Sequence, residues 1–215
     1  MKIEIWSDIA CPWCYIGKRR FEEAWRAFPE RDALDIIWRS FELDPSAPAV
    51  QHTPTVELLA TKYRMPVERA QGLMDQMTAT GAADGITFRF DRSISGNTFD
   101  AHRLIHFAAG QSKRAEMVER LFSAYFTDGV AMGDRTALVR LAPDVGLNAG
   151  EVSAMLDSDA FAADVREDEA RAQQLGISGV PFFAIDEKYG VSGAQPASAL
   201  TDALNQAWSE SAAER

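Results

Sequence analysis

The stretch Asp8–Phe21, DIACPWCYIGKRRF, contains Cys11 and Cys14, the only two cysteines of the 215-residue chain. Two thiols separated by Pro12 and Trp13 can form a redox centre, half of a metal site or a small structural disulfide. The choice among these three decides both fold and function. A disulfide across two intervening residues restrains the unfolded chain very little, so the structural disulfide is the weakest interpretation.

The residues on either side of the motif indicate a βαβ unit. Lys2–Trp6 alternates polar and apolar residues, with both isoleucines on one face, which is typical of a short strand. From Cys11 the apolar residues recur at helical spacing until Pro29 ends the run. Leu34–Leu43 is again rich in β-branched and aromatic residues. Strand, helix and strand within about forty residues predict one βαβ unit.

The C-terminal part supplies a matching piece. Ala163–Gly176 has the pattern of a helix closed by glycine, Phe182–Asp186 that of a strand, and Tyr189–Gly193 that of its hairpin partner. A last helix begins near Pro196. Between the two parts the text is mainly helical, and only Ile86–Phe90 alternates like a strand. The predicted intervening helices are Pro54–Tyr63, Pro66–Thr80, Thr98–Ala109, Ser112–Thr127, Asp134–Leu141 and a short one after Asn148.

The position of the cysteines suits disulfide exchange. Cys11 falls where strand gives way to helix, and Pro12 fits the first helical position because it has no N–H to leave unpaired. We expect the Cys11 sulfur to face the free N–H groups of the first turn, which favour a thiolate. Cys14 lies one turn further on the same face and should be more buried. Cys11 would then be the exposed nucleophile and Cys14 the residue that resolves the mixed disulfide.

A second motif, SGVPFF, places Pro181 just before the predicted strand. Together, SDIACPWCYIG, GVPFF, VSGAQP and the helix NTFDAHRLIHFA resemble the DsbA-type thioredoxin-fold thiol–disulfide oxidoreductases, most closely the FrnE-like members. The resemblance implies a thioredoxin-like α/β fold interrupted by a large all-helical insertion. Residues 1–45 and 163–215 would form the discontinuous thioredoxin-like domain, and residues 46–162 the helical insertion domain.

The resemblance also implies site residues. Cys11 and Cys14 would be the active-site pair, and Pro181 a cis-proline that helps to bind substrate. Val180 would offer backbone hydrogen bonds to an extended chain. Asn97 and His102, on the family-like helix, are further candidates for contact with substrate; helix capping by Asn97 or Thr98 is the alternative.

Two further residues, Trp13 and Asp8, bear on the reactivity of Cys11. Strongly oxidising relatives have a histidine where this chain has Trp13, which supplies apolar cover but no cation. We therefore expect a less oxidising disulfide. Asp8 near Cys11 would oppose a thiolate, or it merely ends the strand.

Composition limits the partners. A formal charge of −10 and an isoelectric point near 4.8 argue against nucleic acid and anionic membranes. The first residues lack a secretory apolar segment, and no apolar run reaches membrane length, so the expected location is cytoplasmic. The expected partners are protein or small-molecule thiols and disulfides, with glutathione as a redox partner. No metal or organic cofactor is expected; the chain would be a monomer or a homodimer.

Three rival functions stay in view. His102 and His106 could join Cys11 and Cys14 in a zinc site, although the spacing fits no compact zinc module. A glutathione-dependent transferase or isomerase of the kappa or 2-hydroxychromene-2-carboxylate isomerase type shares the insertion architecture, but it generally has serine at the position of Cys11 and has no use for Cys14. A binding module would leave both cysteines unexplained. We therefore predict a thiol–disulfide oxidoreductase, whose net direction depends on its reduction potential.

Overall fold

The computed structural model describes residues 1–213 and contains a four-stranded sheet of order β2-β1-β3-β4. β1 and β2 run parallel, whereas β3 is antiparallel to both of its neighbours, β1 and β4. The strands are β1 (Lys2–Ser7), β2 (Asp35–Ser40), β3 (Phe182–Ile185) and β4 (Tyr189–Ser192). The predicted strand–helix–strand unit is therefore confirmed, and so is the C-terminal hairpin.

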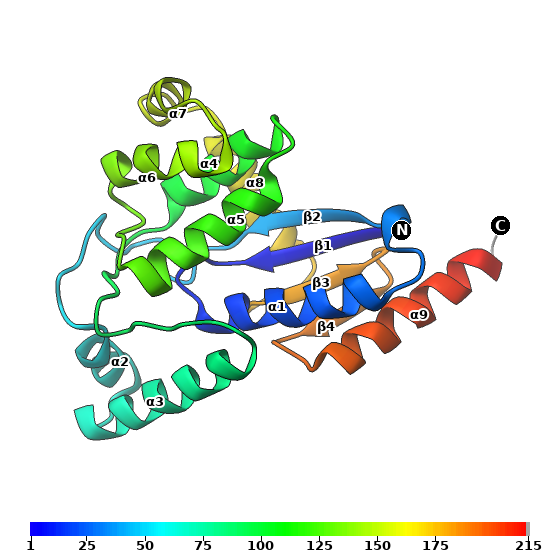
Figure 1. The fold of residues 1–215 in the computed structure, drawn as a ribbon, viewed down its shortest axis with the longest axis horizontal. Helices are drawn as coiled ribbons and strands as arrows, with labels where there is room; N and C mark the ends of the chain where they lie inside the picture. The colour runs from blue at the N-terminus through cyan, green and yellow to red at the C-terminus, as the bar shows by residue number, and fades with distance from the viewer. Residues whose placement is uncertain (214–215) are drawn as a thin grey trace.

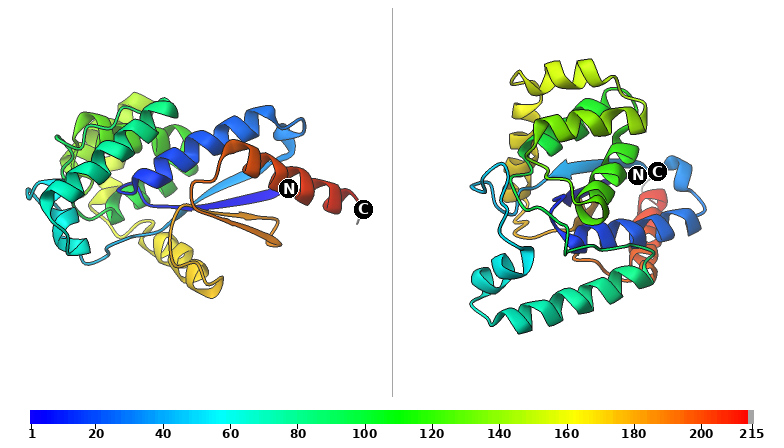
Figure 2. Two further views of the ribbon diagram at one scale, coloured as in Figure 1. Left: turned by 90° about the horizontal axis from the view of Figure 1, so that it is seen from below. Right: turned by 60° about the vertical axis from the view of Figure 1, so that its left-hand side comes forward.

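Helices cover both faces of this sheet. α1 (Pro12–Ala27) and α9 (Ala197–Ala213) lie on one face, and α8 (Ala162–Gln174) lies on the other (Figure 1; Figure 2, left). The alternation in β1 explains both layers. Ile3 and Ile5 belong to the main core with α1 and α9, whereas Trp6 packs with Ala172 beneath the opposite face.

The remaining helices lie between β2 and α8 in the chain and gather at one end of the sheet (Figure 1). They are α2 (Thr55–Tyr63), α3 (Val67–Ala83), α4 (Phe99–Ala109), α5 (Arg114–Ser123), a π-helix (Ala124–Asp128), α6 (Arg135–Leu141), a 3₁₀-helix (Ala142–Val145) and α7 (Ala149–Leu156); a further 3₁₀-helix (Arg31–Ala33) precedes β2. This is the predicted thioredoxin-like fold with a helical insertion. The exact domain boundaries stay a prediction, and residues 214–215 of the predicted C-terminal domain lie outside the described part.

The predicted strand at Ile86–Phe90 is wrong. The segment is irregular, although its alternation does put Ile86 and Phe88 into the core. The backbone of Arg89 donates to Phe126 O at 2.8 Å, but that partner belongs to a π-helix and not to a strand. Alternate side chains of this segment are thus buried although the segment itself forms no strand.

Ion pairs fasten the insertion to the sheet. Lys18 and Arg19 of α1 both pair with Glu119 of α5, and Tyr15 donates to the same carboxylate at 2.8 Å. Arg20 binds Asp84 at the end of α3 through both oxygens. The helix that begins at Cys11 is therefore held in place by two helices of the insertion.

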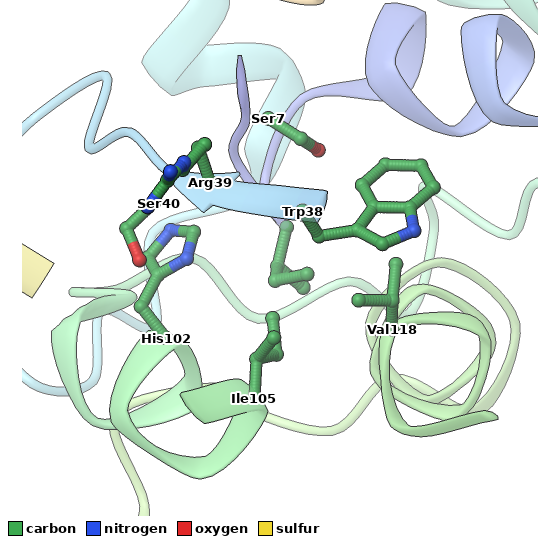
Figure 3. Close-up of a pocket in the computed structure, with 8 residues that line it drawn as sticks. Ser7, Trp38, Arg39, Ser40, His102, Ile105 and Val118 are labelled. Carbon is green, nitrogen blue, oxygen red and sulfur yellow. The ribbon is translucent and has the colours of Figure 1, made fainter. Parts of the chain in front are cut away.

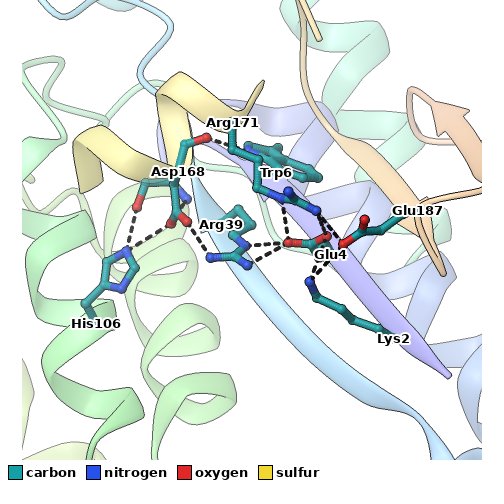
Figure 4. A network of polar contacts seen from close by, with 9 residues as sticks. Lys2, Glu4, Trp6, Arg39, His106, Asp168, Arg171 and Glu187 are labelled. Atoms are coloured by element: carbon teal, nitrogen blue, oxygen red, sulfur yellow. Dashed lines mark hydrogen bonds and ion pairs between the residues drawn. The ribbon is translucent and has the colours of Figure 1, made fainter. Parts of the chain in front are cut away.

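A second polar network joins β1, β2, α4 and α8 (Figure 4). Glu4, only 1% exposed, accepts from Arg39 and Arg171, and the equally buried Asp168 accepts from Arg39 and His106. The two buried carboxylates are thus each paired with arginines that are themselves partly exposed, 24% for Arg39 and 30% for Arg171. Within residues 1–213, no helix is both long enough and apolar enough to cross a membrane.

Candidate active site

Cys11 is the N-cap residue of α1, as predicted. Its backbone is extended (φ −95°, ψ 112°), and Pro12 opens the helix. The backbone N–H of Cys11 donates to Asp8 O at 3.1 Å, which turns the chain sharply between β1 and α1. The Cys11 sulfur, however, makes no cap hydrogen bond to the first turn. Instead, Cys11 Sγ lies 3.7 Å from Val180 O, to which the thiol can donate.

The burial of Cys11 differs from the expected exposed nucleophile. Its side chain is only 5% exposed, because the residues around Val180 and the insertion cover it. Cys11 nevertheless lines a large groove, as do Pro12 and Trp13. A disulfide bound in the groove can therefore reach the Cys11 sulfur, although little of this residue is exposed to solvent.

Cys14 lies one turn further along α1 and is 1% exposed. Burial raises the pKa of the Cys14 thiol well above its ordinary value, and the neighbouring Cys11 sulfur raises it further. The Asp8 backbone and the Ser7 hydroxyl lower the same pKa by stabilising the thiolate, but they do not outweigh burial. Cys14 is thus the more buried sulfur, as predicted, and it needs a proton acceptor before it can attack.

Pro181 faces the cysteine-bearing helix across the site. The Val180–Pro181 peptide bond is cis, as the sequence analysis predicted. A Cβ atom at Gly17 of α1 would lie 2.8 Å from Pro181 Cγ, so only glycine allows the proline ring to come this close. The close approach sets the Val180 carbonyl beside Cys11.

The groove beside Cys11 is largely apolar and has a volume of about 570 Å³. Its walls come from α2 and α3, from the Cys11 turn and from the segment at Val180. Four large, mainly apolar side chains are exposed and all line this groove: Trp13, Leu43, Tyr63 and Leu73. Such a cluster of exposed apolar side chains is unusual on a protein surface. Lys62 is the one charged residue among the described residues that line it. The groove fits an apolar ligand segment.

Asp8 is neither close to open solvent nor a simple end to the strand. It is 2% exposed, and its carboxylate accepts from the backbone N–H of Ala10 at 3.2 Å and of Leu43 at 2.8 Å. His102 Nε2 lies 3.6 Å from the same carboxylate. Asp8 therefore ties the Cys11 turn to the chain that leaves β2 and to α4.

Asn97 and His102 do not line the groove. Asn97 Nδ2 donates to Glu42 Oε1 at 3.1 Å, and its Oδ1 accepts from the backbone of Phe99 at the start of α4. His102 is 2% exposed, and its Nε2 lies 3.6 Å from Asp8 Oδ1. Their predicted contact with substrate is thus without support from the geometry. The N-cap residue of α4 is Thr98, which makes no side-chain cap hydrogen bond, and Asn97 before it accepts from the first N–H of the helix.

The four residues of the zinc alternative do not meet. His106 Nε2 lies 3.0 Å from Asp168 and 3.1 Å from Ser40 Oγ, in the network of Figure 4. In the described part of the chain, no three His, Cys, Asp or Glu side chains are grouped as a metal site would need.

The chain matches the DSBA-like thioredoxin domain family over residues 2–205 and belongs to it. It is 48% identical to a probable DsbA oxidoreductase of Streptomyces coelicolor, whose crystal structure superposes with a TM-score of 0.93 over 98% of this chain and 91% of the other. The two-cysteine motif and the cis-proline thus lie in a fold that the DsbA family shares.

Two more distant structures share the fold alone. A 2-hydroxychromene-2-carboxylate isomerase is 16% identical, with a TM-score of 0.71 over the whole of both chains. The cytosolic disulfide reductase DsbM of Pseudomonas aeruginosa is 17% identical, with a TM-score of 0.66 over 96% of this chain and 98% of the other. The structure of DsbM has also been solved with glutathione.

Sequence reasoning missed the groove walls and the residues behind Cys14. Leu73, Met74 and Met77 have the spacing of an apolar helix face, and that face borders the groove instead of a closed core. Ser7 stands at the end of an alternating strand, where its polarity at a buried position is the available signal. The proximity of His102 to Asp8 has no signal in a single sequence, because 94 positions separate the two.

Proposed function

We propose that this chain is a thiol–disulfide oxidoreductase in which Cys11 exchanges disulfides with its substrates and Cys14 resolves the mixed disulfide. The observation that carries this proposal is the arrangement of the two sulfurs: Cys11 lines the groove opposite Val180, and Cys14 lies behind it, almost fully buried. A substrate in the groove can meet the first sulfur and not the second.

The exchange proceeds in two steps that balance. The Cys11 thiolate attacks one sulfur of a substrate disulfide, forming the Cys11–substrate bond and releasing the other substrate sulfur as a thiolate. Cys14 then loses its proton and attacks Cys11, forming the Cys11–Cys14 disulfide and releasing the second substrate thiolate. The substrate gains two electrons and the cysteine pair loses them. The reverse sequence oxidises a substrate dithiol, so direction follows the reduction potential.

The groove supports protein substrates that present an apolar segment. Trp13, Leu43, Tyr63 and Leu73 offer contact area next to Cys11, and Val180 stands where an extended chain would pass. Glutathione serves as the proposed small redox partner, as a distant relative of this fold was solved with it. The cysteine pair is itself the redox group, so the proposal includes no metal or organic cofactor.

The isomerase alternative has weaker support. The distant isomerase shares the fold, but a reaction that only orients a glutathione thiolate has no use for a second buried thiol. Cys14, in line behind Cys11, favours exchange chemistry. A cytoplasmic location and the FrnE-like assignment remain parts of the proposal; a cytosolic reductase of this fold is consistent with the location.

The test compares wild type with Cys11→Ser and Cys14→Ser in insulin reduction and in reactivation of scrambled ribonuclease. We expect wild type to be active, Cys11→Ser to be inactive, and Cys14→Ser to accumulate a mixed disulfide that mass spectrometry detects. Activity in Cys11→Ser would overturn the mechanism. Inactivity of wild type on protein disulfides, combined with turnover of a glutathione conjugate, would establish the isomerase or transferase alternative instead.

A further inference from the structure

The carboxylate of Asp8 joins two segments that both line the groove beside Cys11. Asp8 Oδ1 accepts from the backbone N–H of Ala10 at 3.2 Å, and Asp8 Oδ2 accepts from the backbone N–H of Leu43 at 2.8 Å. Ala10 and Leu43 line the same groove as Cys11. Asp8 is only 2% exposed, so bulk water does not compete for either bond. The carboxylate therefore fixes one side of the groove relative to the other.

The bond to Ala10 shapes the turn that carries Cys11. A side-chain oxygen that accepts from the N–H two residues further on makes an Asx turn, and asparagine and serine can form the same kind of turn. The backbone oxygen of Asp8 accepts in addition from the N–H of Cys11 at 3.1 Å. The turn thus needs only one of the two carboxylate oxygens.

The bond to Leu43 holds a segment without regular structure. Directly after β2 the chain forms neither helix nor strand. Asn97 binds this segment on either side of Leu43, with its Nδ2 3.1 Å from Glu42 Oε1 and 3.2 Å from Pro45 O. Leu43 itself has its N–H on Asp8, and its side chain is 41% exposed and lines the groove. Without the bond to Asp8, Leu43 can shift while the segment stays attached.

His102 adds no comparable bond. Its ring extends from α4 toward Ser40 at the end of β2, and both residues line a small internal cavity (Figure 3). His102 Nε2 lies 3.6 Å from Asp8 Oδ1, which is too long for a hydrogen bond. Within residues 1–213, the hydrogen bonds of the Asp8 carboxylate are thus those from the N–H groups of Ala10 and Leu43.

We propose that Asp8 is a positioning residue for apolar substrates: through its bond to Leu43, it holds the Leu43 side chain where it contacts an apolar residue next to the substrate cysteine. The inference deepens the proposed function and rests on it. Asp8 touches neither the substrate nor the reacting sulfurs. It acts through Leu43, and Leu43 increases the rate at which Cys11 meets disulfides with apolar neighbours.

Two substitutions separate the two bonds of Asp8. Asp8→Asn keeps one oxygen for the N–H of Ala10, but it sets the amide NH₂ against the N–H of Leu43, a donor against a donor. Asp8→Ser keeps a hydroxyl for the turn, but this side chain is too short to reach Leu43 as well. Both variants should therefore keep the turn at Cys11 and lose the bond that holds Leu43.

The test measures how much apolar neighbours of a substrate cysteine accelerate its reaction with Cys11. Two peptides carry a cysteine flanked by leucines in one and by glycines in the other, each as a mixed disulfide with 2-nitro-5-thiobenzoate. Attack of the Cys11 thiolate on the peptide sulfur forms the Cys11–peptide disulfide and releases the same coloured thiolate from both peptides. The ratio of the two second-order rate constants is the apolar selectivity.

We expect Asp8→Asn and Asp8→Ser each to lower the apolar selectivity about tenfold, because covering the exposed 41% of Leu43 is worth about a factor of ten. Leu43→Ala should lower it by the same factor, and combining it with Asp8→Asn should add no further loss, because both remove one contact. Asp134→Ala is the matched control. Asp134 accepts from the backbone N–H of Ala137 at the start of α6, outside the groove, so its loss should leave the selectivity unchanged.

Unchanged selectivity in the Asp8 variants would overturn the inference. Equal slowing of both peptides would overturn it too, since Asp8 would then act on the Cys11 turn alone, and so would a wild-type selectivity near one. If one Asp8 variant fails to fold, as judged by circular dichroism, the other decides the question. These outcomes leave the proposed function intact, because Cys11 still reacts. Absence of release from both peptides with wild type would instead refute the proposed function on which the inference rests.

Discussion

Gly17 fixes the distance between the helix that carries the cysteines and the cis-proline. We predict that Gly17→Ala destabilises the fold by about 1–3 kcal/mol and lowers the rate of exchange, because the new methyl group would lie 2.8 Å from the rigid Pro181 ring. Gly72→Ala, inside α3 with nothing within 4 Å, is the matched control and should stabilise the fold by about 0.5–1 kcal/mol. Urea unfolding and insulin reduction measure the two effects. Equal behaviour of the two variants would contradict the prediction.

Trp13 is the residue that departs from strongly oxidising relatives, and its place beside Cys11 in the groove makes the departure testable. We predict that Trp13→His raises the reduction potential of the cysteine pair by about 30 mV or more, a tenfold change in the equilibrium. An imidazolium there would stabilise the Cys11 thiolate and hence the reduced form. Titration against glutathione buffers, with alkylation and mass spectrometry, measures the shift. Trp25→His, at the far end of α1, should leave the potential unchanged.

At the scale of elements, periodicity in the sequence was sufficient where a segment is buried on one face. It predicted β1, α1, both hairpin strands and the order of the insertion helices, with ends that differ by a few residues. It failed at Ile86–Phe90, because alternation records which side chains are buried and not whether a strand lies alongside. It also missed that Cys11 is buried, because the cover comes from the insertion and from Val180, which are distant in sequence.

The buried carboxylate of Asp168 joins α8 to β2 and α4. Asp168 is 1% exposed and accepts from the backbone of Ser40 at 2.9 Å, from Arg39 at 2.8 Å and from His106 at 3.0 Å. We predict that Asp168→Asn lowers the free energy of unfolding by about 3–5 kcal/mol, because the neutral amide no longer balances the positive charge of Arg39. Glu167→Gln, exposed on the same helix, should change it by less than about 0.5 kcal/mol. Similar urea midpoints for both variants would contradict this role.

At the scale of the whole molecule, the two polar networks make the insertion and the sheet one framework around the cysteines. Glu119 joins α5 to α1, and the Glu4–Arg39–Asp168 chain joins β1, β2, α4 and α8. The groove beside Cys11 lies within this framework, between the start of α1 and the helices α2 and α3. The positions of Cys11 and Cys14 therefore depend on contacts that cross the whole chain.

The same framework sets how stability depends on pH. Burial alone would raise the pKa of Glu4, but hydrogen bonds from Arg171, Arg39 and Lys2 outweigh it and lower the pKa from 4.5 to about 2. A carboxyl with a lowered folded-state pKa adds stability above its unfolded pKa and loses it as the pH falls through the folded value. Burial also works against ionisation of Asp168, yet its partners lower its pKa as well. Glu42, whose pKa burial raises, acts in the opposite direction.

We therefore predict that the free energy of unfolding falls as the pH is lowered from about 5 to about 2, and that Glu4 accounts for about 3 kcal/mol of the loss, the equivalent of its pKa shift. Glu4→Gln should be less stable than wild type at pH 6, and the gap should narrow as the pH falls, because protonation removes from wild type the charge that the variant already lacks. Urea unfolding at pH 6, 4.5 and 3 measures both trends. A gap that stays constant across this range would show that Glu4 contributes through packing and not through its charge.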